Sequence, residues 1–300
     1  MNSNQILERE KNFIDTISET YQYDSNIRHL LYIIIPAFLL KYGMQKETMI
    51  LSTFRDTIIK KSDKESDIVK AYYSSTLREN HGEYKTQKYM VIQNYQKISL
   101  IDLLDNLVHE FNHAINSYVN EVQEKKEKLY LRTGLTYRIY NKQDLSFIKK
   151  DPSYILEEII NTKQTEDVIN IIKQMDLNDR SLETTIYAIN SETNHKYNSN
   201  SYYLQSYICK EILNNKTFIK TLENLRINGE IYDIDNWFDD IVGQKGMYNS
   251  LITNLHDVYK LELEYKDKKV FKSITLNKIK DKSKEIVRII EKFNNSVNFR

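Results

Sequence analysis

The clearest structural pattern of the chain lies in residues 99–122, which read SLIDLLDNLVHEFNHAINSYVNEV. Apolar residues recur there every three or four positions, which is the period of one face of an α-helix. They are Ile101, Leu104, Val108, Phe111, Ile115, Tyr118 and Val122. Ser99 is suited to cap this helix, with Asp102 three residues on as a variant of the capping box. The stretch therefore predicts a long helix that packs along one side.

The same helix carries the motif His109-Glu110-Phe111-Asn112-His113, an HExxH sequence. Histidines four residues apart lie one above the other on a helix, so both imidazoles can reach one zinc ion at about 2.0–2.1 Å. Glu110 leaves the helix about 100° away from His109, where its carboxylate can take a proton from a metal-bound water. The alternative is a pair of surface histidines with an exposed glutamate.

The histidine side of this helix is otherwise polar, and it lies nearly opposite the apolar stripe. The neighbouring polar residues are Asp105, Asn106, Asn112 and Asn116. We therefore expect one face of the helix to pack and the other to line a cleft.

A catalytic zinc site usually has a third protein ligand and keeps one coordination position open for water. An extended metzincin motif is excluded, because Asn116 and Val119 stand where it needs glycine and histidine. A cysteine ligand is implausible, because Cys209 is the only cysteine and is remote in sequence. A carboxylate from a later helix remains.

The best candidate lies in residues 151–167, DPSYILEEIINTKQTED. Asp151 can cap a helix here and Pro152 can occupy its first turn. The apolar face is formed by Ile155, Leu156, Ile159 and Ile160. Glu158 points away from that face and is the preferred third ligand. Three alternatives stay open: Glu157, Glu166 and His195.

These residues resemble the zincin metallopeptidases, specifically the gluzincin branch. The matching motifs are HEFNH at 109–113 and Glu158 in LEEII. The resemblance covers roughly residues 84–170. It implies that His109, His113 and Glu158 bind one zinc ion and that Glu110 is the general base.

The resemblance also implies a strand beside the active-site helix that pairs with the substrate backbone along its edge. Residues 84–95 are in the right place for it. Such enzymes usually add a tyrosine or histidine that stabilises the oxyanion, and Tyr202 is the preferred candidate.

Composition limits the classes of partner. The chain has 300 residues, with 43 Lys+Arg against 42 Asp+Glu and a formal net charge of +1, which argues against nucleic-acid binding. The most apolar run, residues 30–40, is interrupted by Pro36 and is too short to span a bilayer. The first 23 residues have no apolar signal-peptide core. We therefore expect a cytoplasmic protein without a membrane span.

Only 6 glycines and 2 prolines are present, too few turn residues for an all-β fold. The sequence predicts a predominantly helical α+β fold in three parts: helices in 1–80, a zincin-like metal-binding core with a small sheet in 81–180, and a helical part in 181–300. The three parts are expected to form one compact catalytic unit. Residues 129–140 alternate like a strand, with Gly134 marking a bulge or a turn.

The predicted function is that of a zinc metallopeptidase acting on a peptide or protein substrate. The first alternative is a zincin-fold binding or regulatory protein without turnover. A metal-free helical interaction protein is the second. The sequence does not indicate whether the protein is a monomer or an oligomer.

Overall fold

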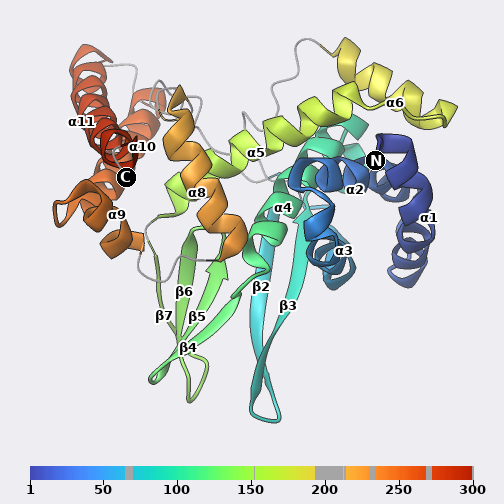
Figure 1. The fold of residues 1–300 in the computed structure, drawn as a ribbon, viewed down its shortest axis with the longest axis horizontal. Helices are drawn as coiled ribbons and strands as arrows, with labels where there is room; N and C mark the ends of the chain where they lie inside the picture. Colours follow the sequence, from blue (N-terminus) through green and yellow to red (C-terminus); the bar gives the residue numbers. More distant parts are fainter. Residues whose placement is uncertain are drawn as a thin grey trace. The chain divides into compact units, whose positions relative to one another are not determined.

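The computed structural model describes residues 1–64, 70–151, 153–192, 212, 214–229, 234–267 and 272–298. It is 65% helical and holds two small sheets, so the expected predominantly helical α+β fold is confirmed (Figure 1). The chain divides into two compact units, one of Met1–Tyr118 with Asn161–Ser201 and one of Val119–Ile160 with Tyr202–Arg300. The boundaries expected at residues 80 and 180 stay predictions.

The first unit is built mainly of helices around one three-stranded sheet. Its elements are α1 (Ser3–Thr20), α2 (Ser25–Tyr42), η1 (Met44–Lys46), α3 (Glu47–Asp56), β1 (Thr57–Lys61), β2 (Ala71–Asn80), β3 (Glu83–Ile92), η2 (Tyr95–Lys97), α4 (Leu100–Ser117) and α6 (Arg180–Ser191). Helix α2 starts after Asp24, whose side chain accepts a hydrogen bond from Ile27 N at 3.0 Å. It runs through Pro36 without a break and buries the apolar run that the sequence marked.

No single helix of the described part of the chain is long and apolar enough to cross a membrane. Helix α2 passes such a test only together with Met44–Asp56, from which it is bent by 110°.

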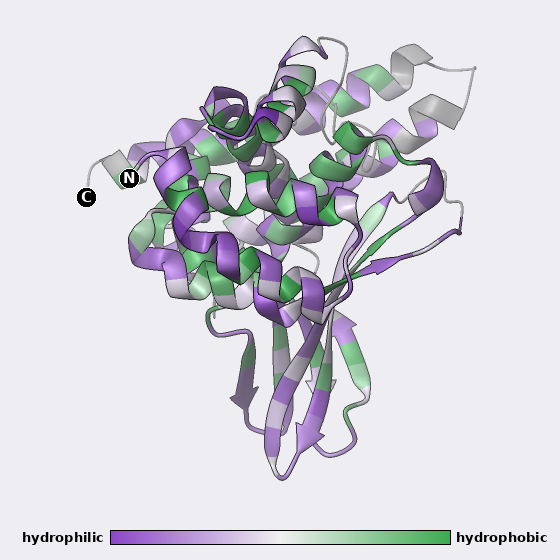
Figure 2. Cartoon of the chain, turned by 90° about the vertical axis from the view of Figure 1, so that its right-hand side faces the viewer, coloured by the Kyte–Doolittle hydropathy of each residue, from purple (hydrophilic) through white to green (hydrophobic). Residues whose placement is uncertain are grey.

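The sheet of the first unit has the order β1-β3-β2. Strand β1 runs parallel to β3, and β2 forms an antiparallel hairpin with it, from Ala71 opposite Ile92 to Asn80 opposite Glu83. Helix α4 packs against β2 and β3, beside which it lies in Figure 1. The end of the hairpin that carries the turn is hydrophilic (Figure 2). The strand expected in residues 84–95 is confirmed as β3, whereas β1 and β2 lie where only helices were expected.

The second unit contains a four-stranded antiparallel sheet in the order β4-β5-β6-β7, together with a group of helices. Its elements are β4 (Val122–Lys125), β5 (Lys128–Thr133), β6 (Thr136–Asn141), β7 (Phe147–Lys150), α8 (Lys216–Asn228), α9 (Ile234–Val242), α10 (Met247–Asp267) and α11 (Lys272–Asn298). Gly134, at φ 56°, makes the turn between β5 and β6. Of the two expectations for this glycine, the turn is therefore confirmed.

Helix α5 (Tyr154–Gln174) is one continuous helix whose first residues are counted with the second unit and whose later residues are counted with the first. The helix predicted from residues 151–167 is thus confirmed. Asp151 precedes it and accepts a hydrogen bond from Ser153 N at 2.7 Å, while Pro152 lies outside the described residues. Its predicted apolar face is buried at all four positions, Ile155, Leu156, Ile159 and Ile160.

Candidate metal centre

Helix α4 begins as the sequence predicts. The Ser99 side chain accepts a hydrogen bond from Asp102 N at 3.0 Å and donates one to the Asp102 carboxylate at 2.6 Å. The helix ends at Ser117, so Tyr118 and Val122, which were expected on it, lie beyond its end. His109 and His113 lie on successive turns, with ring centroids 4.9 Å apart.

The polar side of α4 is buried, contrary to the expectation that it lines a cleft. Every residue from Leu103 to Ser117 is buried, including His109 at 3% exposure and both Glu110 and His113 at 5%. A polar helix face can be covered when its groups find hydrogen-bond partners inside the protein. Sequence periodicity identifies the polar face and does not reveal what covers it.

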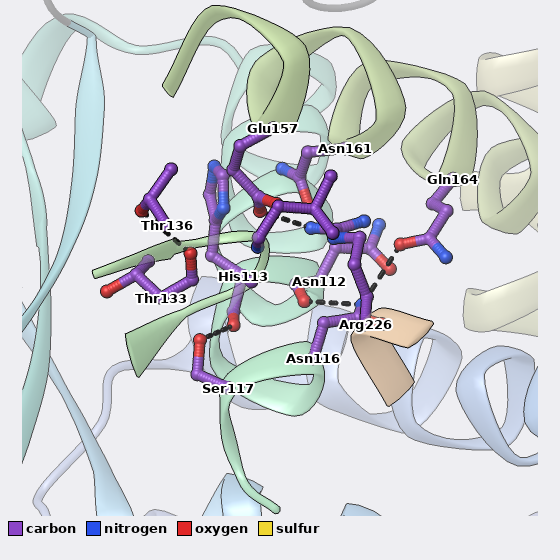
Figure 3. A network of polar contacts seen from close by, with 12 residues as sticks. Asn112, His113, Asn116, Ser117, Thr133, Thr136, Glu157, Asn161, Gln164 and Arg226 are labelled. Atoms are coloured by element: carbon purple, nitrogen blue, oxygen red, sulfur yellow. Dashed lines mark hydrogen bonds and ion pairs between the residues drawn. The ribbon is translucent and has the colours of Figure 1, made fainter. Parts of the chain in front are cut away.

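Part of this cover comes from amide and hydroxyl side chains of α5. Asn116 Nδ2 donates to Gln164 Oε1 at 3.0 Å, as Figure 3 shows, and Asn112 Nδ2 donates to Thr165 Oγ1 at 3.2 Å. Tyr42 of α2 adds a third contact, because its hydroxyl donates to Asn112 Oδ1 at 3.0 Å. These contacts to Asn112 and Asn116 are neutral hydrogen bonds.

One further bond fixes the part of α5 that matters for a metal. Asn161 Nδ2 donates to the carbonyl oxygen of His109 at 3.0 Å. Glu158 precedes Asn161 by three residues and so lies on the same side of α5. His109, His113 and Glu158 each offer one ligand atom, and the three atoms lie within 4.8 Å of one another. The structure thus brings together the three residues predicted as ligands.

The donor set fits zinc. Two imidazoles and one carboxylate are the protein ligands of a common class of catalytic zinc sites, which keep the fourth position open. Tetrahedral ligands at about 2.0–2.1 Å from the ion lie roughly 3.4 Å apart, so small side-chain rotations would close the present arrangement around an ion. That an ion binds, and that it is zinc, stay predictions.

Glu157, the close rival for the third position, is engaged elsewhere. Its carboxylate accepts a hydrogen bond from Leu135 N at 2.7 Å and forms an ion pair with Arg226 of α8 (Figure 3). Both members of this pair are buried. This engagement favours Glu158 over its neighbour.

The other candidates do not join the group. Glu166 is exposed on α5, two turns after Glu158. His195, the second alternative ligand, and Tyr202, the candidate for the oxyanion, lie outside the described residues.

The expectation that residues 84–95 pair with a substrate along a sheet edge stays a prediction. Strand β3 is the central strand, flanked by β1 and β2 over Lys88–Ile92, while among the described strands Glu83–Gln87 pairs with β2 alone. Among the described strands β2 pairs with β3 alone, so β2 is an edge strand next to α4. Sheet order depends on pairings between distant segments, and β1 and β2 were not anticipated.

Sequence reasoning also missed the surroundings of Glu157. Arg226 stands in the apolar context Leu225-Arg226-Ile227 and is fully buried; a lone arginine in a buried stretch is a usable signal, because buried charges are paired. Arg132, also fully buried, donates to the carbonyl oxygens of Gly134 at 2.8 Å and of Arg226 at 3.1 Å.

The sequence matches no family model, and neither curated proteins nor solved structures match it. The interpretation of the site therefore depends on its residues and their geometry.

Proposed function

We propose that this protein is a zinc-dependent metallopeptidase. The observation that carries the proposal is the convergence of His109, His113 and Glu158 within 4.8 Å, with Glu110 directly after the first histidine. A third donor from another helix at the same point as the histidine pair is not required by the fold. The zincin-like core and the identity of the metal are parts of this proposal.

Each residue has a distinct role. His109, His113 and Glu158 would hold the ion. A zinc ion bound there supplies a Lewis acid that polarises the scissile carbonyl and makes water acidic enough to react near neutral pH. Glu110 accepts the proton of the attacking water and delivers it to the departing amine nitrogen.

Strand β2 is the best placed element to orient a peptide. It lies beside α4, and among the described strands its outer edge has no neighbour. The backbone of an extended peptide can add to such an edge through main-chain hydrogen bonds. Peptide pairing along β2 takes the place of the role expected for residues 84–95.

The mechanism is tested by Glu110→Gln, which keeps the size of the side chain and removes the base. We expect the variant to retain about one zinc per chain and to lose peptide hydrolysis by about 100-fold or more, because a general base contributes at least that factor. The same substitution at Glu183, exposed on α6, is the matched control. Wild-type hydrolysis by zinc-loaded Glu110→Gln protein would refute the proposed base.

A zincin-fold binding or regulatory protein without turnover is the second candidate. The observation that favours it is the burial of Glu110 and of both histidines, which also suits a zinc ion that only holds structure. Tight binding of one zinc ion, with no cleavage of a diverse fluorogenic peptide library, would support this candidate over the peptidase. Cleavage of any library member that stops on zinc removal would exclude it.

A further inference from the structure

Glu157, which forms a buried ion pair with Arg226, directly precedes the proposed metal ligand Glu158 in sequence. Glu157 is 2% exposed and Arg226 is fully buried. Because taking charges out of water is costly, a buried ion pair needs good geometry and further hydrogen bonds. Glu157 has such a further bond, because Leu135 N donates to its Oε2 at 2.7 Å.

Arg226 is itself held in a frame of backbone contacts. Its carbonyl oxygen accepts a hydrogen bond from Arg132 Nη1 at 3.1 Å. The same nitrogen of Arg132 donates to Gly134 O at 2.8 Å, and Nε of Arg132 donates to Val119 O at 3.1 Å. Arg132 therefore connects the end of α8 to the β5–β6 turn. The Glu157 carboxylate binds next to the same turn, through Leu135 N.

Gly134 leaves the space that the carboxylate fills. A Cβ atom added to this glycine would overlap the carboxylate of Glu157. Its φ of 56° is also a conformation that residues with a side chain rarely adopt. The turn thus has a glycine where the acid of α5 must approach the backbone closely.

Glu157 and Glu158 are consecutive on α5, about 100° apart around the helix axis. Rotation of the first turns of α5 would break the contacts of Glu157 with Leu135 N and Arg226 and would carry the Glu158 carboxylate away from the two imidazoles. We infer that Glu157 and Arg226 are positioning residues, which lock the rotation of α5 so that Glu158 faces His109 and His113. This inference rests on the proposed function, because it takes Glu158 as a ligand of zinc.

Two variants test in different ways whether the contact of Glu157 with Arg226 and the β5–β6 turn, called the lock below, fixes the rotation of α5. Glu157→Leu/Arg226→Met removes both charges and their bonds, and leaves no unpaired buried charge to prevent folding. Gly134→Ala keeps both charged residues and displaces the Glu157 carboxylate. The control is Asp167→Asn, which removes an acid of α5 that pairs with Lys41 at 2.9 Å, ten residues from the lock.

The measurements are the zinc dissociation constant of the folded protein and the visible absorption of the Co2+-substituted protein, made well below each variant's unfolding temperature. Loss of a group that orients a metal ligand typically weakens binding by about 10- to 100-fold. We expect this loss, with an altered Co2+ spectrum, in both test variants, and wild-type values in Asp167→Asn. A merely structural role would lower the unfolding temperature without changing the spectrum.

Wild-type affinity and spectrum in both test variants, while Glu158→Gln loses zinc binding, would overturn the lock and leave the proposed function standing. Failure of the wild-type chain to bind zinc or Co2+ would overturn both.

Discussion

Helix α5 is held in two chemically different ways along its length. Near its start, Glu157 forms a buried ion pair with Arg226. From Asn161 onward, its buried polar side chains are amides and a hydroxyl that form neutral hydrogen bonds to α4, as Gln164 does to Asn116. One helix therefore has a charged anchor and a neutral anchor, separated by about one turn.

The difference predicts unequal sensitivity to mutation. A buried charge that loses its partner costs several kcal/mol, whereas a neutral group left without its partner costs about 1–3 kcal/mol. The charged anchor has few alternative arrangements, because a guanidinium and a carboxylate fix both distance and direction. We therefore expect the region next to Glu158 to be the stiffer part of the attachment of α5.

The largest effect is expected from Arg226→Met. It leaves the Glu157 carboxylate buried with Leu135 N as its described donor, and we expect the free energy of unfolding to fall by about 3–5 kcal/mol. In the double variant Glu157→Gln/Arg226→Met no charge is left unpaired, and the amide oxygen can still accept from Leu135 N. Urea denaturation of the two proteins measures the difference. Equal destabilisation of the single and double variants would show that an unpaired buried charge is not what makes the Glu157–Arg226 pair sensitive to mutation.

A smaller effect is expected from Gln164→Leu. It removes one of the acceptors of the Asn116 amide at a buried site, while Asn112 O and the Tyr42 hydroxyl remain, and we expect a loss of about 1 kcal/mol in the free energy of unfolding. Zinc affinity should change less than in the Gly134→Ala variant, because the bond from Asn161 to His109 O remains. Urea denaturation and zinc titration on the same samples decide it. A loss as large as that of Arg226→Met would mean that the two anchors do not differ.

The contrast between the anchors also marks the limit of sequence reasoning. Local periodicity was sufficient for α4, α5 and β3, because a helix or strand face is encoded within its own residues. It favoured Glu158 as the third ligand but left Glu157 open as an alternative, because the two are neighbours on the same polar side of one helix.

The residue that distinguishes the two glutamates is Arg226, which pairs with Glu157 and lies 69 positions from it along the chain. Sheet order fails for the same reason, since β3 became central only through pairing with β1 and β2. The His109–His113 pair was the easiest part of the site to predict, because one helical turn contains it. What the sequence could not provide were contacts made between elements far apart along the chain.

The smallest effect concerns a buried neutral group that can acquire a charge. His29 of α2 is partly buried, and its Nε2 lies 2.7 Å from Thr185 Oγ1 of α6. Burial lowers the pKa of His29 below its usual value, and the negative charge of Asp179 opposes this only in part. The folded protein therefore takes up this proton at a lower pH than the unfolded chain does.

The sign of the pH dependence follows from that difference. The contribution of His29 to stability is complete above the unfolded pKa of about 6.5 and is lost as the pH falls through the folded pKa. We expect the unfolding temperature to decrease from pH 7 to pH 5, and His29→Gln, which stays neutral, to reduce that decrease. The same substitution at His81, exposed at the β2–β3 turn, is the matched control. If His29→Gln and wild-type protein lose stability equally over this range, protonation of His29 does not cause the loss of stability at low pH. The cause would then be sought at the Glu157–Arg226 pair.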